Sequence, residues 1–248
     1  MIELIKKYKK ISILLLTFLV FDITLAALAL IPANKDVTSP GGLNEVKSVI
    51  KVNTDSNLEG SFNTIYVYSM ERVSLLQSWI ASLANYNEVS DSSTSIILSD
   101  EERLLSGKIQ KDQSIEASLI CAYEAAKMKL DYNFIGLIVY IKQVDHNVFK
   151  IGDIITQING STTEEDLIKA IKNLKIDDII TYKRNNEIKT YVVDERLKGS
   201  NKGFGVYYKY EINSETASPS YTLFESNTLG PSGGLMQTLS VYSQITGK

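Results

Sequence analysis

The sequence has little of what disulfide, metal and nucleotide sites need. Its 248 residues include one cysteine, one histidine and four prolines. A single cysteine excludes an intramolecular disulfide, and we expect Cys121, which lies in an apolar stretch, to be a small buried core residue. No segment matches the glycine-rich phosphate loop, so the chain carries no recognisable ATPase. We therefore expect neither a metal nor a cofactor.

The chain also lacks an excess of positive charge. It has 26 lysine and arginine residues against 29 aspartate and glutamate residues, for a net charge of −3. Proteins that bind nucleic acid usually present a dense basic stripe, and beyond the N-terminus this sequence has none. We therefore exclude nucleic acid as the main partner. The hydrophobic content of 44% is enough for one or two globular domains at this length.

Long apolar runs are missing except at the N-terminus. Residues 11–31 form one such run, interrupted only by the charge of Asp22, and four lysines lie among residues 6–10. A run of this length spans a bilayer as a helix, and the preceding lysines favour a cytoplasmic N-terminus. We expect a retained membrane anchor with the bulk of the chain extracytoplasmic. The alternative is a cleaved signal peptide, for which Ala27-Leu28-Ala29 offers a cleavage site.

Beyond the anchor, the hydrophobic periodicity predicts a mixed α+β fold. Alternating apolar positions indicate strands around residues 46–52 and 60–70. Spacings of three and four indicate helices over residues 71–83 and 114–130. All of these apolar residues are most simply explained as core.

The apolar pattern and the turn residues of positions 134–193 predict two strands, a short helix and a hairpin. The first strand is entered through Gly136, and the second ends at an Asn159-Gly160 turn. The final two strands are joined at Asn185-Asn186. This order describes one compact module of about sixty residues.

Three short motifs in this module resemble those of a bacterial PDZ domain. They are GLIV at residues 136–139, IGDII at residues 151–155 and ING at residues 158–160. The helix between residues 164 and 174 is expected to open with a capping box formed by residues 162–165. An unrelated small α+β module is the alternative interpretation.

A PDZ domain binds an extended peptide by adding it as a strand beside its helix. The resemblance implies that the peptide-binding strand is formed by Gly136, Leu137, Ile138 and Val139. The groove would lie between this strand and the helix that begins at Glu164.

The final stretch, LGPSGGLMQTLSVYSQITGK, places Ser232 between Gly-Pro and Gly-Gly. A serine at the start of a helix is exposed, and the helix amides near it can receive a developing oxyanion. Gly233 and Gly234 would let the backbone approach a substrate carbonyl. The alternative is that Ser232 only caps the helix. One face of this helix is expected to be apolar, formed by Leu235, Met236, Leu239 and Tyr242.

Residues 230–236, with the sequence GPSGGLM, resemble the nucleophile motif of the Lon proteolytic domain. The order of anchor, mixed region, PDZ module and serine motif is similar to that of the membrane-anchored, PDZ-containing Lon-like proteases of bacteria. This resemblance implies an ATP-independent serine endopeptidase that acts on peptides or unfolded proteins through a Ser-Lys dyad, with Ser232 as nucleophile. It also implies a homo-oligomer.

In this family the dyad lysine is expected several tens of residues after the serine, whereas sixteen residues follow Ser232. We therefore expect the proteolytic domain to be incomplete and the chain as written to be catalytically silent. His146 has no acidic partner that can be tied to both it and the serine, so it is not expected to act as the base. A non-catalytic, membrane-anchored PDZ adaptor is the alternative function.

These expectations give four consecutive regions. A cytoplasmic stub and transmembrane anchor occupy residues 1–33, and an extracytoplasmic α+β region occupies residues 34–132. A PDZ domain follows at residues 133–197, and residues 198–248 begin a Lon-like proteolytic domain.

Overall fold

The computed structural model describes residues 8–54, 60–93, 96, 98–143, 148–197 and 203–247. The protein mixes helix and sheet, with 38% helix and 37% strand, in agreement with the α+β content expected from the sequence. The helices are α2 (Lys9–Leu30), α3 (Leu75–Ser82), α4 (Asp100–Ala126), α5 (Glu164–Lys172) and α6 (Gly234–Thr246). The strands are β1 (Pro32–Glu45), β2 (Ile50–Val52), β3 (Asn63–Ser74), β4 (Glu88–Asp91), β5 (Lys129–Lys142), β6 (Ile154–Ile158), β7 (Ile179–Arg184), β8 (Glu187–Val192), β9 (Phe204–Ser218) and β10 (Tyr221–Leu223).

The chain forms two compact units that are interleaved along the sequence. The first combines residues 1–42 with residues 67–93, and the second combines residues 43–66 with residues 94–248. Each unit therefore brings together segments that are distant in the sequence, whereas the regions expected from the sequence follow one another along the chain.

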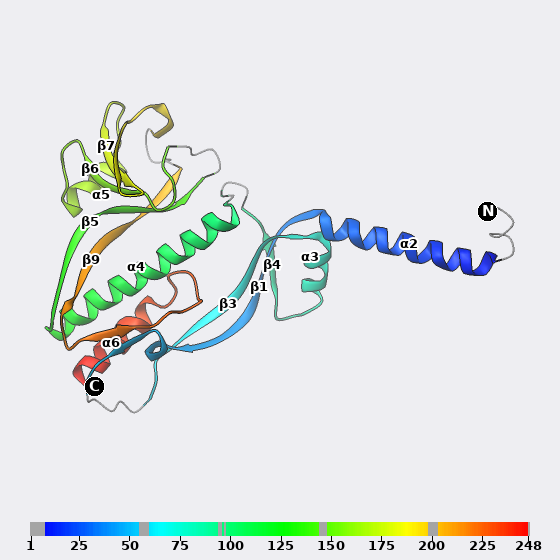
Figure 1. Ribbon diagram of the computed structural model, residues 1–248, viewed down its shortest axis with the longest axis horizontal. Coiled ribbons are helices and arrows are strands. Elements are labelled where there is room, and N and C mark those ends of the chain that lie inside the picture. Colours follow the sequence, from blue (N-terminus) through cyan, green and yellow to red (C-terminus); the bar gives the residue numbers. More distant parts are fainter. Residues whose placement is uncertain are drawn as a thin grey trace. The chain divides into compact units, whose positions relative to one another are not determined.

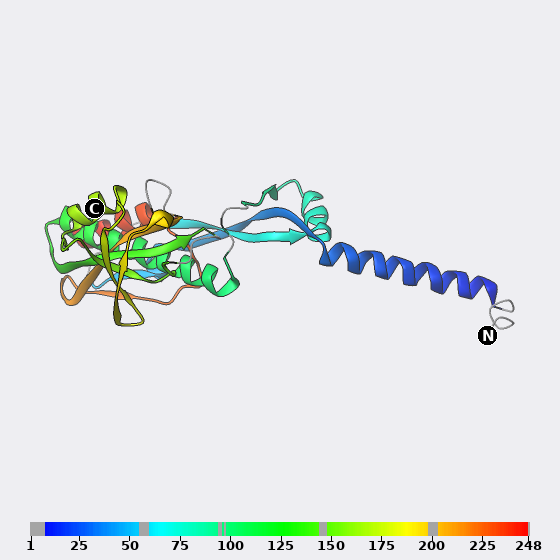
Figure 2. The ribbon, with the colours of Figure 1, turned by 90° about the horizontal axis from the view of Figure 1, so that it is seen from above.

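In the first unit, α2 is an unbroken apolar helix (Figure 2) with no buried residue. The hydroxyls of Thr17 and Thr24 each donate to the carbonyl four residues earlier. These bonds satisfy the two hydroxyls within the helix itself. Among the described residues, α2 is the one helix long and apolar enough to cross a membrane.

The rest of the first unit is α3 with most of the three-stranded sheet β3-β1-β4; residues 43–45 of β1 and 63–66 of β3 belong to the second unit. Its small core contains Val37, Val73 and Ala81. The helix predicted from residue 71 begins only at Leu75, because β3 continues to Ser74. Ser74 is the N-cap of α3 and forms a capping box with Gln77, which fixes where the helix starts.

The second unit contains an antiparallel five-stranded sheet in the order β8-β7-β6-β5-β9. Both turns predicted inside this module are present. Asn159 and Gly160 have positive φ angles of 50° and 88°, and Asn185 and Asn186 have φ angles of 51° and 65°. Asparagine and glycine tolerate this left-handed conformation better than other residues.

Helix α5 begins one residue later than the predicted capping box implies. Thr163, rather than Thr162, is the N-cap, and its hydroxyl accepts a hydrogen bond from the backbone N–H of Asp166. The predicted N-cap was wrong because each of the two adjacent threonines is followed three residues later by an acidic residue, so the sequence pattern fits both. The extended backbone at Thr163, with φ −73° and ψ 152°, decides between them.

The long helix α4 is covered on two sides (Figure 1). On one side its Ile109 packs in a cluster with Ile138 of β5 and Tyr207 of β9. On the other side its Leu119 packs with Ile50 of β2 and Val241 of α6.

Cys121 lies on the remaining face of α4 and is exposed, so the predicted buried position was wrong. Ala117, Cys121 and Glu124 are all exposed and are spaced by four and three residues, which puts them on one stripe of the helix. The apolar residues on either side of Cys121 in the sequence point toward the two buried sides of α4, whereas Cys121 itself lies on the exposed stripe.

A buried ion pair links strand β7 to the loop that precedes strand β6. The guanidinium of Arg184 lies 2.6 Å from Asp153, whose side chain is 2% exposed, and it also donates to the carbonyl of Val148. The same Asp153 oxygen, Oδ2, also accepts the backbone N–H of Lys150, and Oδ1 accepts the Nε–H of Arg184 at 2.9 Å. This bonding to Asp153 raises the pKa of Arg184. The aspartate of the IGDII motif is therefore structural in this fold.

We predict that Asp153→Ala destabilises the protein by about 3–5 kcal/mol, because it leaves a desolvated guanidinium without its partner. Urea unfolding of the chain in mild detergent, followed by circular dichroism, measures this loss. The control is Glu165→Ala, which breaks the exposed ion pair between Glu165 and Lys169. That change should cost less than about 0.5 kcal/mol. Equal losses for the two variants would contradict the prediction.

Candidate functional site

Ser232 lies in the turn that leads into α6, and its side chain is exposed. The N-cap of this helix is Gly233, and no side chain caps it. Other helices of the chain do use a capping hydroxyl, from Ser74, Ser99 and Thr163. The capping interpretation of Ser232 is therefore wrong, and its hydroxyl has no hydrogen-bond partner among the described residues.

The loop around this serine is fastened to α4 by backbone hydrogen bonds. The N–H of Gly230 donates to the carbonyl of Gly107 at 3.0 Å. The ammonium of Lys111 donates to the carbonyl of Ser226 at 2.9 Å. Because the loop is held at both points, the exposed position of Ser232 is determined by α4.

Two further hydroxyls of α4 hold the beginning of α6. Ser114 donates to the carbonyl of Pro231 at 3.2 Å, and Ser118 donates to the carbonyl of Gly234 at 2.9 Å. The loop thus contacts α4 at positions 107, 111, 114 and 118, spaced by four, three and four residues along one helix face. This stripe was not predicted from the sequence, although its small and polar residues at helical spacing were the available signal.

Gly233 and Gly234 lie against α4 and β3. A side chain at Gly233 would meet the Gln237 amide at 2.7 Å and the Thr64 methyl at 3.3 Å. One at Gly234 would meet the Ser114 hydroxyl at 3.0 Å. The two glycines therefore permit close packing of α6, in addition to any role toward a substrate.

The expected apolar face of α6 is largely turned outward. Leu235 is 68% exposed, and Met236 and Leu239 are also exposed, while Tyr242 is half-buried. The buried residues of α6 are mostly polar: Gln237, Ser240, Val241, Ser243 and Gln244. The side of α6 toward α4 and β2 combines Val241 with hydrogen-bonding side chains. The amide of Gln244, for example, accepts the backbone N–H of Val52.

No general base contacts Ser232 within the part of the chain that the structure describes. Lys111 is engaged by the carbonyl of Ser226. His146 lies outside the described residues. The described residues also contain no group of three side chains suited to a metal ion.

The strand expected to receive a peptide is already paired on both sides. Leu137 of β5 lies opposite Ile155 of β6 and also opposite Tyr208 of β9. Residues 136–139 therefore present no open edge, and a peptide could add there only by displacing β6 or β9. Gly136 has a positive φ of 146°, and a side chain at this position would lie 2.4 Å from the carbonyl oxygen of Ile155. Its role in the fold is this close approach of the two strands.

The open edge of the sheet on this side belongs to β9. The start of α5 lies close to it, since the hydroxyl of Tyr210 bonds to the carboxylate of Glu164. Burial, followed by this hydrogen bond, raises the pKa of Tyr210. Among the described strands the open edge is thus at β9, one strand away from the predicted position, while α5 packs against β5 and β6 and reaches β9 through Glu164.

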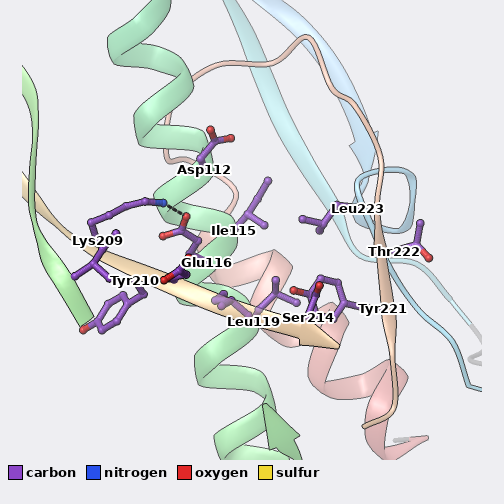
Figure 3. Close-up of a pocket in the computed structure, with 13 residues that line it drawn as sticks. Asp112, Ile115, Glu116, Leu119, Lys209, Tyr210, Ser214, Tyr221, Thr222 and Leu223 are labelled. Carbon is purple, nitrogen blue, oxygen red and sulfur yellow. Dashed lines mark hydrogen bonds and ion pairs between the residues drawn. The ribbon is translucent and has the colours of Figure 1, made fainter. Parts of the chain in front are cut away.

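A cavity of about 730 Å³ lies between α4, β9 and β10 (Figure 3). Ile115 and Leu119 of α4 form its apolar floor. Glu116 and Lys209 form a partly buried ion pair at its side. Burial and the nearby charge of Glu116 raise the pKa of Tyr221, which lines the opposite side.

Protein-family models, curated proteins and solved structures include no match to this chain.

We predict that Gly107→Ala destabilises the protein by about 1–3 kcal/mol through overpacking, because the new methyl would lie 2.9 Å from the Leu229 Cβ. Urea unfolding in detergent measures the change. The double variant Gly107→Ala with Leu229→Gly, which removes the Leu229 Cβ, should be about as stable as Leu229→Gly alone. A stabilisation of about 1 kcal/mol, as expected for alanine replacing glycine in an unobstructed helix, would contradict the close contact.

We also predict that Gly136→Ala is more damaging than Gly160→Ala. Both positions have positive φ, but at Gly160 the nearest atom to a new methyl is 3.9 Å away. Gly160→Ala should therefore cost about 1–2 kcal/mol of backbone strain alone. Gly136→Ala adds the clash with Ile155 and should weaken the β5–β6 pairing. Amide hydrogen exchange at Leu137 and Ile155 measures this, and equal exchange in the two variants would contradict it.

Proposed function

We propose that this protein is a membrane-anchored serine endopeptidase of the Lon-like type with Ser232 as its nucleophile. The observation that carries the proposal is the exposed Ser232 hydroxyl, which does not cap the helix that it precedes. Gly107 and Lys111 of α4 hydrogen-bond to its loop, which fixes the position of the serine. The Ser232 hydroxyl itself makes no hydrogen bond to a described residue. Preorganisation of this kind is what a nucleophile requires.

In the proposed reaction, the Ser232 oxygen attacks a peptide carbonyl and its proton passes to a base. The developing oxyanion lies near the N-terminus of α6, where the uncapped backbone N–H groups and the positive end of the helix dipole stabilise negative charge. The C–N bond then breaks as the amine leaves with a proton, and water hydrolyses the acyl-enzyme. The base is proposed to be a lysine whose ammonium is disfavoured by burial.

The anchor belongs to the same proposal. Helix α2 is proposed to cross the membrane once, with Lys9 and Lys10 at its cytoplasmic end. The remainder of the chain would then be extracytoplasmic, where ATP is not supplied. Its substrates would be peptides, flexible tails or already unfolded proteins. A homo-oligomer is part of the proposal by resemblance to Lon-type domains.

Peptide recognition by the PDZ-like module is proposed at the edge of β9. Unlike residues 136–139, this strand has an edge without a partner strand in the described residues. Glu164, at the start of α5, contacts Tyr210 of this strand. An extended peptide could pair with this edge through main-chain hydrogen bonds.

The second candidate function is a non-catalytic, anchored adaptor that binds peptides. It is favoured by one observation: no described lysine, histidine or carboxylate contacts Ser232. In that case the serine loop would be a structural element, and the edge of β9 would be the functional surface.

Hydrolysis of a quenched fluorescent casein in detergent micelles tests the assigned nucleophile. No described base contacts Ser232, so we expect the chain as written to be silent in this assay. In a longer protein that carries this chain together with the dyad lysine, Ser232→Ala should remove all hydrolysis above background, because no other nucleophile occupies the turn. The control is Ser226→Ala, which alters a neighbouring serine whose carbonyl, rather than its hydroxyl, binds Lys111. Hydrolysis that survives Ser232→Ala would refute the assigned nucleophile. Peptide binding without hydrolysis, even when the lysine is supplied, would favour the adaptor.

A further inference from the structure

The cavity between α4, β9 and β10 is bordered by a strand edge that pairs with no described strand. Strand β10 pairs only with β2 among the described residues, and the two strands form a sheet that packs over α4. In Figure 3 the side chains of Leu223 and Tyr221 point toward the cavity, whereas that of Thr222 points away from it. The two-stranded sheet therefore leaves part of α4 uncovered, and the cavity lies over that part.

The backbone of β10 is arranged to accept another strand. The N–H of Phe224 donates to the carbonyl of Val49, and the carbonyl of Ser220 accepts the N–H of Asn53. In an antiparallel ladder, alternate residues direct their N–H and C=O groups to the same neighbour. The groups of Tyr221 and Leu223 consequently point away from β2, toward the open edge. An open strand edge of this kind is a template for a further strand.

The cavity supplies the side-chain environment that such a strand would need. Its floor is apolar, formed by Ile115 and Leu119, and Leu223 adds to it. The positive charge of Lys209 is already neutralised by Glu116. The remaining charges of the lining are the carboxylates of Asp112 and Glu211, which have no partner among the described residues. The rim is therefore net negative and complements a basic side chain.

From these three observations we propose that the edge of β10 binds an extended peptide segment of another protein as a third strand of the β2-β10 sheet. Alternate side chains of this peptide are apolar and fill the cavity over Ile115 and Leu119, and a lysine or arginine beside them faces Asp112 and Glu211. This site uses none of the atoms of the Ser232 turn, so it goes beyond the proposed protease function.

The test uses the full chain in mild detergent with a fluorescein-labelled peptide of sequence Lys-Thr-Val-Thr-Val-Thr-Val, in which the lysine and the three valines share one face of the strand. Fluorescence anisotropy should report binding, and hydrogen exchange should report protection of the N–H groups of Tyr221 and Leu223. A peptide with its central valine replaced by proline should bind about tenfold more weakly, because it lacks a donor and cannot continue the ladder.

Two variants at one position test the edge itself. Leu223→Pro removes the N–H that points to the open side and should weaken peptide binding about tenfold, while Leu223→Ala keeps that N–H, loses only apolar contact in the cavity and should weaken binding less than Leu223→Pro does. Ser232→Ala should leave binding unchanged, which separates this site from the proposed nucleophile. Replacing both carboxylates, by Asp112→Asn with Glu211→Gln, should remove the preference for lysine over glutamate in the peptide.

Several outcomes would overturn the proposal. One is the absence of protection at Tyr221 and Leu223 in the wild-type chain with saturating peptide, a result that does not depend on any variant folding. Another is equal binding of the proline-containing peptide. A third is sedimentation that shows a dimer, abolished by Leu223→Pro, without any peptide binding, because the occupant would then be a second copy of the chain.

Discussion

Helix α4 has to be covered on two opposite sides, and the second unit is built around this requirement. Its Ile109 side is covered by β5 and β9, and its Leu119 side by β2, β10 and α6. A third stripe, with Gly107 and Ser118 among its residues, binds the carbonyl and N–H groups of the serine loop. Because one rigid helix carries all three surfaces, it fixes the serine turn, the sheet and the cavity together.

The contrast between Ser232 and the capping hydroxyls illustrates how a local pattern acquires another role. At Ser74 and Thr163 the backbone is extended at the N-cap itself, so the hydroxyl reaches back to the helix. At α6 the N-cap is Gly233, and the carbonyls of Pro231 and Gly234 are drawn to α4 instead. The hydroxyl of Ser232 is left outside, which is the arrangement that a nucleophile needs.

Open strand edges are the second feature that connects the fold to its proposed functions. The five-stranded sheet leaves β9 with an open edge, and β10 has another. Proteins usually cover or charge such edges because they attract other chains. Here the start of α5 lies beside one edge, through Tyr210, and a cavity with an apolar floor lies beside the other. Both surfaces fit extended polypeptide, the substrate class implied by the sequence motifs.

The sequence by itself determined the features that depend on neighbouring residues: the apolar helix at residues 9–30, the turns at Asn159 and Asn185, and the α+β content. Apolar run length and positive φ are local properties, so they can be read from the sequence. Only the tertiary structure decided that Cys121 is exposed and that α6 buries glutamines and serines while Leu235 faces outward. Burial of these residues depends on hydrogen bonds between segments 116 to 192 residues apart in the sequence. No spacing within one helix or strand specifies which neighbour will cover it.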